Sequence, residues 1–417
     1  MIPFDRFTLP NGLRFIVHHD PNTPILAMNI LYDVGARDED PEQTGFAHLF
    51  EHLMFGGSVN IPRYDEPLQL AGGENNAFTN SDITNYYLTL PVQNAETAFW
   101  LESDRMLSLA FSEKSLEVQR NVVVEEFRQS YLNQPYGDVW LLLKPLAYIT
   151  HPYQWNTIGK ETAHITNASL EDVRRFYARF YNPNNAIVTV AGNVSTAYIK
   201  EMAEKWFGPI PAGPVNERKL AKEPEQTTDR LNEVERDVPF SAVYKAWHMC
   251  AQQHPDYYVI DLLSDLLGSG NSSRLYVELV RKQKIFSEIG AFITGDIDPG
   301  LFVVHGKVMP GVDPYTADQG IQQVIEHLIS QKISEAELRK VKNKAIASLA
   351  FENISLLNRA MNLTFHEHHG DAGQINKLPA MYAKINVDSL AKASRELFRK
   401  GNCNTLIYKS VNKENRE

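Results

Sequence analysis

The residues best suited to do chemistry form one pentad, His48-Leu-Phe-Glu51-His52. In a helix, at about 100° per residue, its three polar side chains fall within an arc of about 100°. Two imidazole nitrogens one turn apart can bind one Zn²⁺ at about 2.0–2.1 Å each. The carboxylate between them is placed to take a proton from a water on the metal. The order H-x-x-E-H thus indicates a catalytic zinc site, inverted from the H-E-x-x-H of thermolysin-like enzymes.

A five-residue pattern also arises by chance, and histidines four residues apart often only decorate a solvated helix face. The metal interpretation therefore depends on a helix over Gly45 to Phe55. Apolar residues on the opposite face predict that helix and would anchor it: Phe46, Leu49, Phe50, Leu53 and Met54. Gly56-Gly57 supplies the chemistry of a helix end directly afterwards.

A catalytic zinc needs a third protein ligand and an open position for water. The segment QRNVVVEEFRQ, residues 119–129, offers two candidates, Glu125 and Glu126. On a helical wheel, Glu126 lies near the apolar stripe, whereas Glu125 points nearly opposite to it. A carboxylate directed into an apolar interface is costly unless it is paired or metal-bound. Glu126 is therefore the preferred ligand, and the fold must bring two distant helices together.

The composition is that of a folded protein without a nucleic-acid or membrane role. The chain has 417 residues, 43% of them hydrophobic and 22% charged, which suffices for two to three domains. Its net charge of −10 has the wrong sign for binding nucleic acid or an anionic membrane. We find no apolar run long enough to predict a transmembrane segment. The first residues lack export-signal features, so we expect a cytoplasmic protein, or a periplasmic one if a leader was removed.

Short apolar or alternating runs predict strands near Phe7–His18, Ile25–Val34, Tyr86–Leu90 and Ala186–Ala191. Further helices are predicted at Ala95–Ala110, Ser112–Tyr131 and Leu170–Tyr181. A polar, Pro-containing stretch predicts a linker over residues 211–237, after which a strand-like and a helical run start again at Ala242 and Tyr257. We therefore expect an α+β fold with two layered domains, residues 1–210 and 238–417.

HLFEH at 48–52, NNAFT at 75–79 and RNVVVEE at 120–126 together resemble the pitrilysin family of inverted-motif zinc peptidases. That family includes insulin-degrading enzyme and the mitochondrial processing peptidases. Similar stretches at 151–159, 180–194 and 272–283 extend the resemblance over most of the chain. The length is similar to that of the shorter members, which carry two homologous sandwich domains and pair two chains into a clamshell. The resemblance implies largely antiparallel sheets covered by helices, with a zinc-binding first domain and a non-catalytic second one.

The resemblance also implies an activity, that of a zinc metalloendopeptidase acting on extended peptides or small unfolded proteins enclosed in a chamber. His48, His52 and Glu126 would hold one Zn²⁺ per chain. Glu51 would activate the zinc-bound water as general base and return the proton to the leaving amine. Manganese or cobalt can also occupy a site of two histidines and one carboxylate.

For substrate binding, the resemblance implies that NNAFT is an edge strand that adds an extended peptide to its sheet, through Asn76 and Ala77. Without the resemblance, Asn76 is an ordinary turn or strand-end asparagine. Arg281 matches the arginine of the family's Arg/Tyr substrate-binding pair, but Glu288 stands where the tyrosine is expected. Gln119 replaces a family glutamate, so a carboxylate that supports the metal ligands is missing.

These departures leave the quaternary state and the activity open. The incomplete Arg/Tyr pair suggests a heterodimer with a related subunit that supplies it, and a homodimer is the alternative. A non-catalytic or conditionally active structural subunit of a heteromeric assembly is the second candidate function. The complete set of His48, Glu51, His52 and Glu126 favours the peptidase, because a structural subunit is free to lose these residues.

Overall fold

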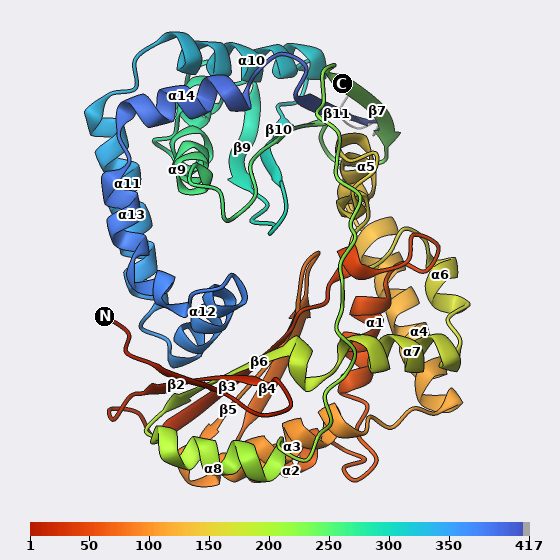
Figure 1. Cartoon of the computed structure of the whole chain (residues 1–417). Helices are drawn as coiled ribbons and strands as arrows, with labels where there is room; N and C mark the ends of the chain where they lie inside the picture. The colour runs from red at the N-terminus through yellow and green to blue at the C-terminus, as the bar shows by residue number, and fades with distance from the viewer. Residues whose placement is uncertain (412–417) are drawn as a thin grey trace. The chain divides into compact units, whose positions relative to one another are not determined.

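The computed structural model describes residues 1–411 and divides into two compact units. Unit 1 comprises Met1–Arg128, Trp155–Leu220 and Ala350–Leu378, and unit 2 comprises Gln129–Gln154, Ala221–Leu349 and the residues from Pro379 onward. Each unit contains one β-sheet with helices packed against it (Figure 1). The predicted α+β fold with two layered domains is confirmed.

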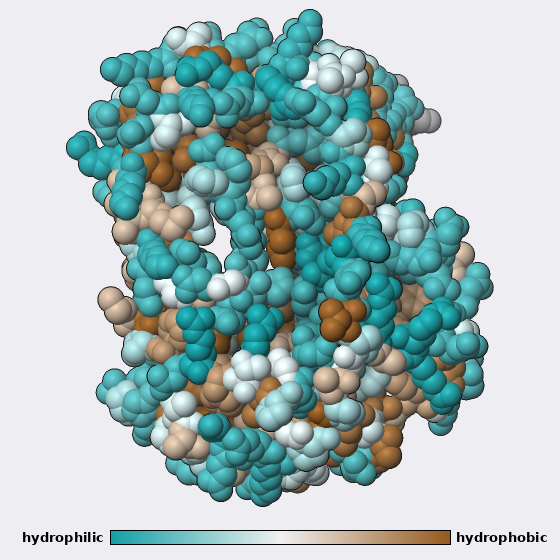
Figure 2. All heavy atoms as spheres, viewed as in Figure 1, coloured by the Kyte–Doolittle hydropathy of each residue, from teal (hydrophilic) through white to brown (hydrophobic). Residues whose placement is uncertain are grey.

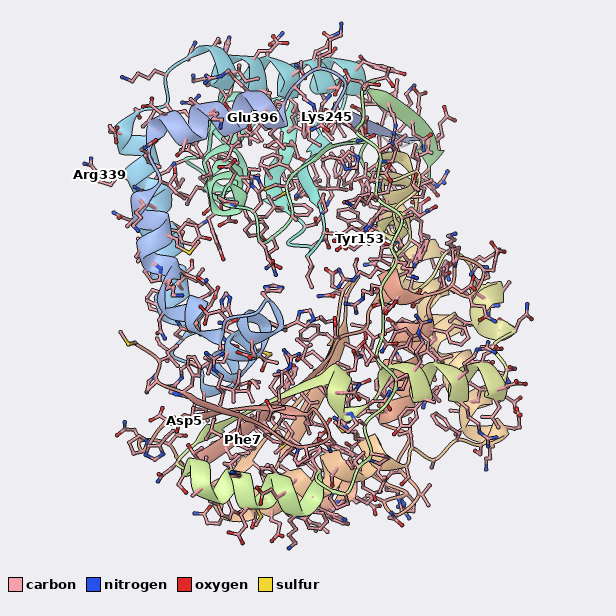
Figure 3. The ribbon with its side chains drawn as sticks, in the orientation of Figure 1. Asp5, Phe7, Tyr153, Lys245, Arg339 and Glu396 are labelled. Carbon is pink, nitrogen blue, oxygen red and sulfur yellow. The ribbon has the colours of Figure 1, made fainter. Side chains whose placement is uncertain are left out.

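The sheet of unit 1 has six strands in the order β1-β2-β6-β3-β5-β4. They are β1 Asp5–Thr8, β2 Arg14–His19, β3 Ile25–Tyr32, β4 Glu74–Thr79, β5 Thr84–Pro91 and β6 Ala186–Gly192. Neighbouring strands are antiparallel except for β2 and β6. The central strands β3 and β6 are buried on both faces, mostly by apolar side chains but also by the polar Asn29 and Thr189. The edges are β4 and β1, and Asp5 and Phe7 mark the latter in Figure 3.

The helices of unit 1 are α1 Phe46–Met54, α2 Asp65–Leu70, α3 Ala95–Leu107, α4 Glu113–Phe127, α6 Thr162–Thr166, α7 Leu170–Phe180, α8 Thr196–Trp206 and α12 Leu356–His368. Helix α1 lies where the pentad predicted a helix, and its apolar face is buried. Helix α4 contacts α1, and α1 also contacts β4 and β5. The elements that carry the pentad, the second glutamate segment and NNAFT therefore meet within unit 1.

The sheet of unit 2 has five strands in the order β7-β11-β8-β10-β9. They are β7 Arg230–Arg236, β8 Ala242–His248, β9 Phe286–Ile293, β10 Leu301–Val308 and β11 Cys403–Ser410. Its helices are α5 Val139–Ala147, α9 Tyr257–Gly268, α10 Pro314–Ser330, α11 Glu335–Glu352, α13 Leu378–Lys384 and α14 Val387–Leu397. The buried Lys245 of β8, which is labelled in Figure 3, pairs with Asp318 of α10. The strand order repeats that of unit 1 from β2 to β4, including one parallel pair, β7 with β11.

Each unit also contains one helix from the other half of the sequence. Helix α12 packs on β6, β3 and β2 of unit 1 (Figure 1), and α5 packs on β11, β8 and β7 of unit 2. The units therefore differ from the predicted continuous domains 1–210 and 238–417 by these two exchanged segments.

The predicted linker 211–237 differs from the structure at its end, because Arg230–Arg236 forms β7. Its sequence, RLNEVER, has only two apolar residues, which suits an edge strand but gives a weak strand signal. In the described part of the chain, no helix is long and apolar enough to cross a membrane. The surface seen in Figure 2 is mostly hydrophilic, with small scattered apolar areas.

Candidate metal centre

Helices α1 and α4 bring together the three predicted metal ligands, His48, His52 and Glu126. The Nε2 atoms of the two histidines lie 3.3 Å apart. Glu126 Oε2 lies 3.4 Å from Nε2 of His52 and 3.7 Å from Nε2 of His48. Ligand atoms held about 2.0–2.1 Å from a tetrahedral ion lie about 3.3–3.4 Å from one another, so this donor set fits zinc. Among residues 1–411 it is the only group of His, Cys, Asp and Glu close enough to hold a metal.

The burial of α4 explains which of its two adjacent glutamates reaches the histidines. The helix buries Leu116, Val123 and Phe127. Glu126 is partly covered and turns toward α1, whereas Glu125 is exposed and pairs with Arg128 at 3.6 Å. The carboxylate near the apolar stripe is thus the one that meets the imidazoles.

The local electrostatics favour the protonation states that a divalent cation requires. Burial lowers the pKa of His48 to about 4, against the attraction of the Glu126 carboxylate. The hydrogen bond with His52 lowers the pKa of Glu126, which keeps that carboxylate ionised. Metal ligands must be neutral imidazoles and ionised carboxylates. His48 Nδ1 is buried and has no hydrogen-bond partner among the described residues, so Gln119 does not support this ligand.

Glu51 lies on α1 between the two histidines, beside the end of strand β4. Burial raises the pKa of its carboxyl group, and hydrogen bonding to Thr79 opposes that rise. A carboxyl with a raised pKa is suited to accept and return a proton near neutral pH. Sequence reasoning missed Thr79, because its proximity to Glu51 depends on how β4 packs against α1.

The predicted substrate residues Asn76 and Ala77 lie on β4, the edge strand that contacts α1. Asn76 is exposed and Ala77 is half-buried. The backbone N–H of Ala77 donates to Asn76 Oδ1 at 2.8 Å. An edge amide that is bonded to a neighbouring side chain can exchange that partner for another chain.

The remaining predicted residue, Arg281, belongs to unit 2, whereas the other site residues belong to unit 1. It is exposed in the helical turn Tyr276–Lys282. Glu288, at the position where a tyrosine was expected, lies on β9 and pairs with Lys307 at 3.0 Å. This ion pair occupies Glu288 within its own sheet.

Sequence reasoning also missed Glu39, whose carboxyl group accepts hydrogen bonds from the backbone N–H groups of Gly45 and Ala47 at the start of α1. The one local signal was indirect. Helix α1 begins at a glycine rather than at a side chain that can cap it.

Both halves of the chain resemble known proteins. Residues 14–151 match the family described as Insulinase (Peptidase family M16), and residues 167–345 match the Peptidase M16 inactive domain. The chain is 30% identical over 410 residues to the zinc protease PqqE of Helicobacter pylori, which covers 96% of this chain and 92% of that protein. The chain belongs to the M16 peptidase family.

Two further comparisons extend over most of this M16 chain. The crystal structure of a protease from Helicobacter pylori matches it with a TM-score of 0.92 and 29% identity, covering 98% of this chain and 100% of that one. A probable mitochondrial-processing peptidase subunit beta of Arabidopsis thaliana is 24% identical over 354 residues, or 82% of this chain and 66% of that protein. The family resemblance predicted from the motifs is confirmed. The three ligand candidates and Glu51 all lie in the first matched region.

Proposed function

We propose that this M16 chain is a zinc-dependent endopeptidase that hydrolyses extended peptides or small unfolded proteins. The observation that carries the proposal is the separation of the three ligand atoms, 3.3, 3.4 and 3.7 Å, with the Glu51 carboxyl on the same helix as two of them. The relatives in Helicobacter pylori and Bacillus subtilis are both named zinc proteases, which supports the choice of metal.

His48, His52 and Glu126 would hold the metal, each through one atom. A bound zinc ion supplies a Lewis acid that polarises the scissile carbonyl and acidifies water. Glu51 would accept the proton of the attacking water and return it to the leaving amine. Partial burial strengthens the interactions of this carboxyl.

The edge of β4 would align the substrate. An extended peptide that pairs with an edge strand is recognised through its backbone, regardless of its sequence. The N–H of Ala77 would then donate to a substrate carbonyl instead of to Asn76 Oδ1. Because β4 contacts α1, a peptide added there would run close to Glu51.

We further propose that the chain acts as one member of a pair of M16 chains, as a heterodimer or a homodimer. Its fold matches 48% of the longer periplasmic protease PqqL of Escherichia coli, and the Arabidopsis relative is named a subunit. Glu288 favours the heterodimer, because its pairing with Lys307 replaces the expected tyrosine. The same observation keeps a second candidate open, a structural subunit that is inactive alone.

The test is cleavage of a fluorogenic peptide library by wild type, Glu51→Gln and Ser264→Ala, with zinc measured on every sample. Ser264 occupies the position of Glu51 in the corresponding helix α9, so it is the matched control. We expect stoichiometric zinc in all three proteins. Cleavage should fall by roughly 10²–10⁴-fold in Glu51→Gln only, which is the usual contribution of a general base.

Other outcomes separate the alternatives. Zinc in wild type without cleavage would favour the structural subunit or an absent partner, and adding a related M16 subunit from the same source would distinguish them. Wild type that binds no zinc, manganese or cobalt would contradict the proposed metallopeptidase.

A further inference from the structure

Helix α1 carries two of the three metal ligands but begins without a side-chain cap of its own. Its N-cap is Gly45, in the left-handed region at φ +91°. The first four N–H groups of any α-helix lack partners within the helix. In α1 two of the amides at this end are bonded by one residue from an earlier loop, Glu39. Its Oε2 accepts from the N–H of Gly45 and its Oε1 from that of Ala47, each at 2.8 Å.

The packing around Gly45 explains why the cap comes from outside the helix. A Cβ atom at this position would lie 2.8 Å from the carbonyl oxygen of Ile158 and 2.8 Å from Cδ1 of Ile165. Ser, Thr, Asn or Asp, the usual N-cap residues, would therefore not fit there. The chain enters α1 through a space that admits only glycine, and Glu39 supplies the acceptors instead.

Glu39 is itself held in place. It is only 6% exposed, and burial raises the pKa of its carboxyl to about 8, while the bonds from Ala47 and Gly45 pull it back down. Arg37, two residues earlier in the loop, is buried and pairs with Asp82 at 2.9 Å. The carboxyl group therefore forms a fixed point against which the start of α1 is set.

The metal centre is sensitive to the rotation of α1. A group at the helix surface lies about 5–6 Å from the axis, so a rotation of about 10° moves it by about 1 Å. Metal–ligand distances tolerate only about 0.2 Å. Ala47, the second amide bonded by Glu39, directly precedes His48. An anchor at this residue acts on the first ligand and, one turn later, on His52.

We propose that Glu39 is a positioning residue for the metal centre, which fixes the rotation of α1 so that His48 and His52 both face Glu126. The inference rests on the proposed function only in that the centre binds a metal. It assigns Glu39 no contact with substrate or metal.

The test measures zinc affinity by competition with a chromophoric chelator, together with the absorption spectrum of the cobalt-loaded protein. The variants are Glu39→Gln and Asp38→Asn. Glutamine keeps one acceptor but places its NH₂ group against the other backbone N–H. We expect Glu39→Gln to weaken zinc binding by about 10–100-fold, as loss of a supporting partner does, and to alter the cobalt spectrum. Asp38 lies in the same loop as Glu39, and Asp38→Asn weakens its pairing with Arg218 but leaves the α1 amides bonded to Glu39. The zinc affinity of this variant should therefore stay within about twofold of wild type.

Glu39→Asp serves as a second variant in case glutamine prevents folding. It keeps the acid but is one methylene shorter, so it reaches at most one of the two amides and should give an intermediate affinity. Wild-type zinc affinity and cobalt spectrum in Glu39→Gln or Glu39→Asp would overturn the inference. So would an equal loss of affinity in Asp38→Asn, which would show a general effect of the loop. Wild type that binds no metal would instead overturn the proposed function.

Discussion

Units 1 and 2 share one strand order but differ in the side chains at the place where unit 1 has its candidate metal ligands. In both, an α-helix follows a central strand and comes before the edge strand in sequence, α1 after β3 in unit 1 and α9 after β8 in unit 2. A second helix in each unit supplies a side chain that contacts this one. Helix α4 contacts α1 in unit 1, and α11 contacts α9 in unit 2. In unit 1 that side chain is Glu126, beside His52. In unit 2 it is Lys344, whose Nζ lies 2.8 Å from Asp265.

The difference shows that the scaffold supplies the place and a few side chains decide its chemistry. Unit 2 has two aspartates, Asp261 and Asp265, where unit 1 has two histidines. An ammonium group from Lys344 neutralises Asp265, and the Tyr382 hydroxyl donates to Asp261 at 2.6 Å. The acidic pair of unit 2 is therefore satisfied by protein groups, whereas the imidazoles and carboxylate of unit 1 form a donor set for a cation.

The exchanged helices differ as well. Helix α5 packs Val139, Leu143 and Ala147 into an apolar cluster of unit 2. Helix α12 packs the apolar Leu363 on Ile16 and Ile187, and it also meets the sheet of unit 1 through small and polar side chains. Ala360 packs on alanines of β3 and β6, and Thr364 accepts from Asn29 at 3.0 Å inside the interface. Helix α5 is held mainly by apolar burial, whereas α12 combines apolar burial with hydrogen-bonded polar side chains inside the interface.

The largest expected effect concerns metal binding, compared between His52→Ala and Asp265→Ala. His52→Ala removes one of three protein ligands, so it should weaken zinc binding by more than the roughly 100-fold that loss of a supporting partner causes. Asp265→Ala, at the corresponding position of unit 2, should leave zinc affinity unchanged. Chelator competition checks both. Equal losses in the two variants would show that the units are not distinct in metal binding.

The next effect concerns stability, compared between the exchanged helices. Leu143→Ala should cost about 2–5 kcal/mol of unfolding free energy, because Leu143 is fully buried and its loss leaves a cavity. Thr364→Val keeps the shape but leaves the Asn29 amide and the Thr189 hydroxyl short of a partner, which should cost about 1–3 kcal/mol. Urea unfolding measures both variants. A larger cost for Thr364→Val would reverse the proposed contrast.

The smallest effect is a pH dependence in unit 2. Hydrogen bonding to Arg274 lowers the pKa of Glu337 to about 2, from an ordinary value of 4.5. A depressed pKa gives stability that is complete above about pH 4.5 and is lost as the pH falls toward 2. Glu337 is partly exposed, so the contribution should be at most about 1 kcal/mol.

The free energy of unfolding, measured with urea between pH 5 and 3, should therefore fall less steeply for Glu337→Gln than for wild type. Glu335→Gln, an exposed neighbour on the same helix, is the matched control and should follow wild type. If the free energy of unfolding fell equally with pH in all three proteins, the ion pair of Glu337 with Arg274 would contribute nothing to stability.

Local periodicity was enough to predict α1, α4 and most of the central strands, because an apolar face recurs at a fixed spacing in each. It was also enough to prefer Glu126 over Glu125, since the neighbouring residues define the buried side of α4. The exchange of α5 and α12 could not be predicted, because an amphipathic pattern does not state which sheet will cover it. Glu39 was missed for a related reason. Its hydrogen bonds to α1 depend on the crowded position of Gly45 at the start of that helix, which is known only from the packing.

We expect unit 1 to bind the metal and unit 2, despite its similar strand order, to bind none. The most direct measurement is an anomalous difference map at the zinc edge from crystals of the zinc-loaded protein. We expect one peak per chain, about 2.0–2.1 Å from the Nε2 atoms of His48 and His52 and from a Glu126 oxygen. A peak beside Asp265 and Lys344, or no peak between the two histidines, would contradict it.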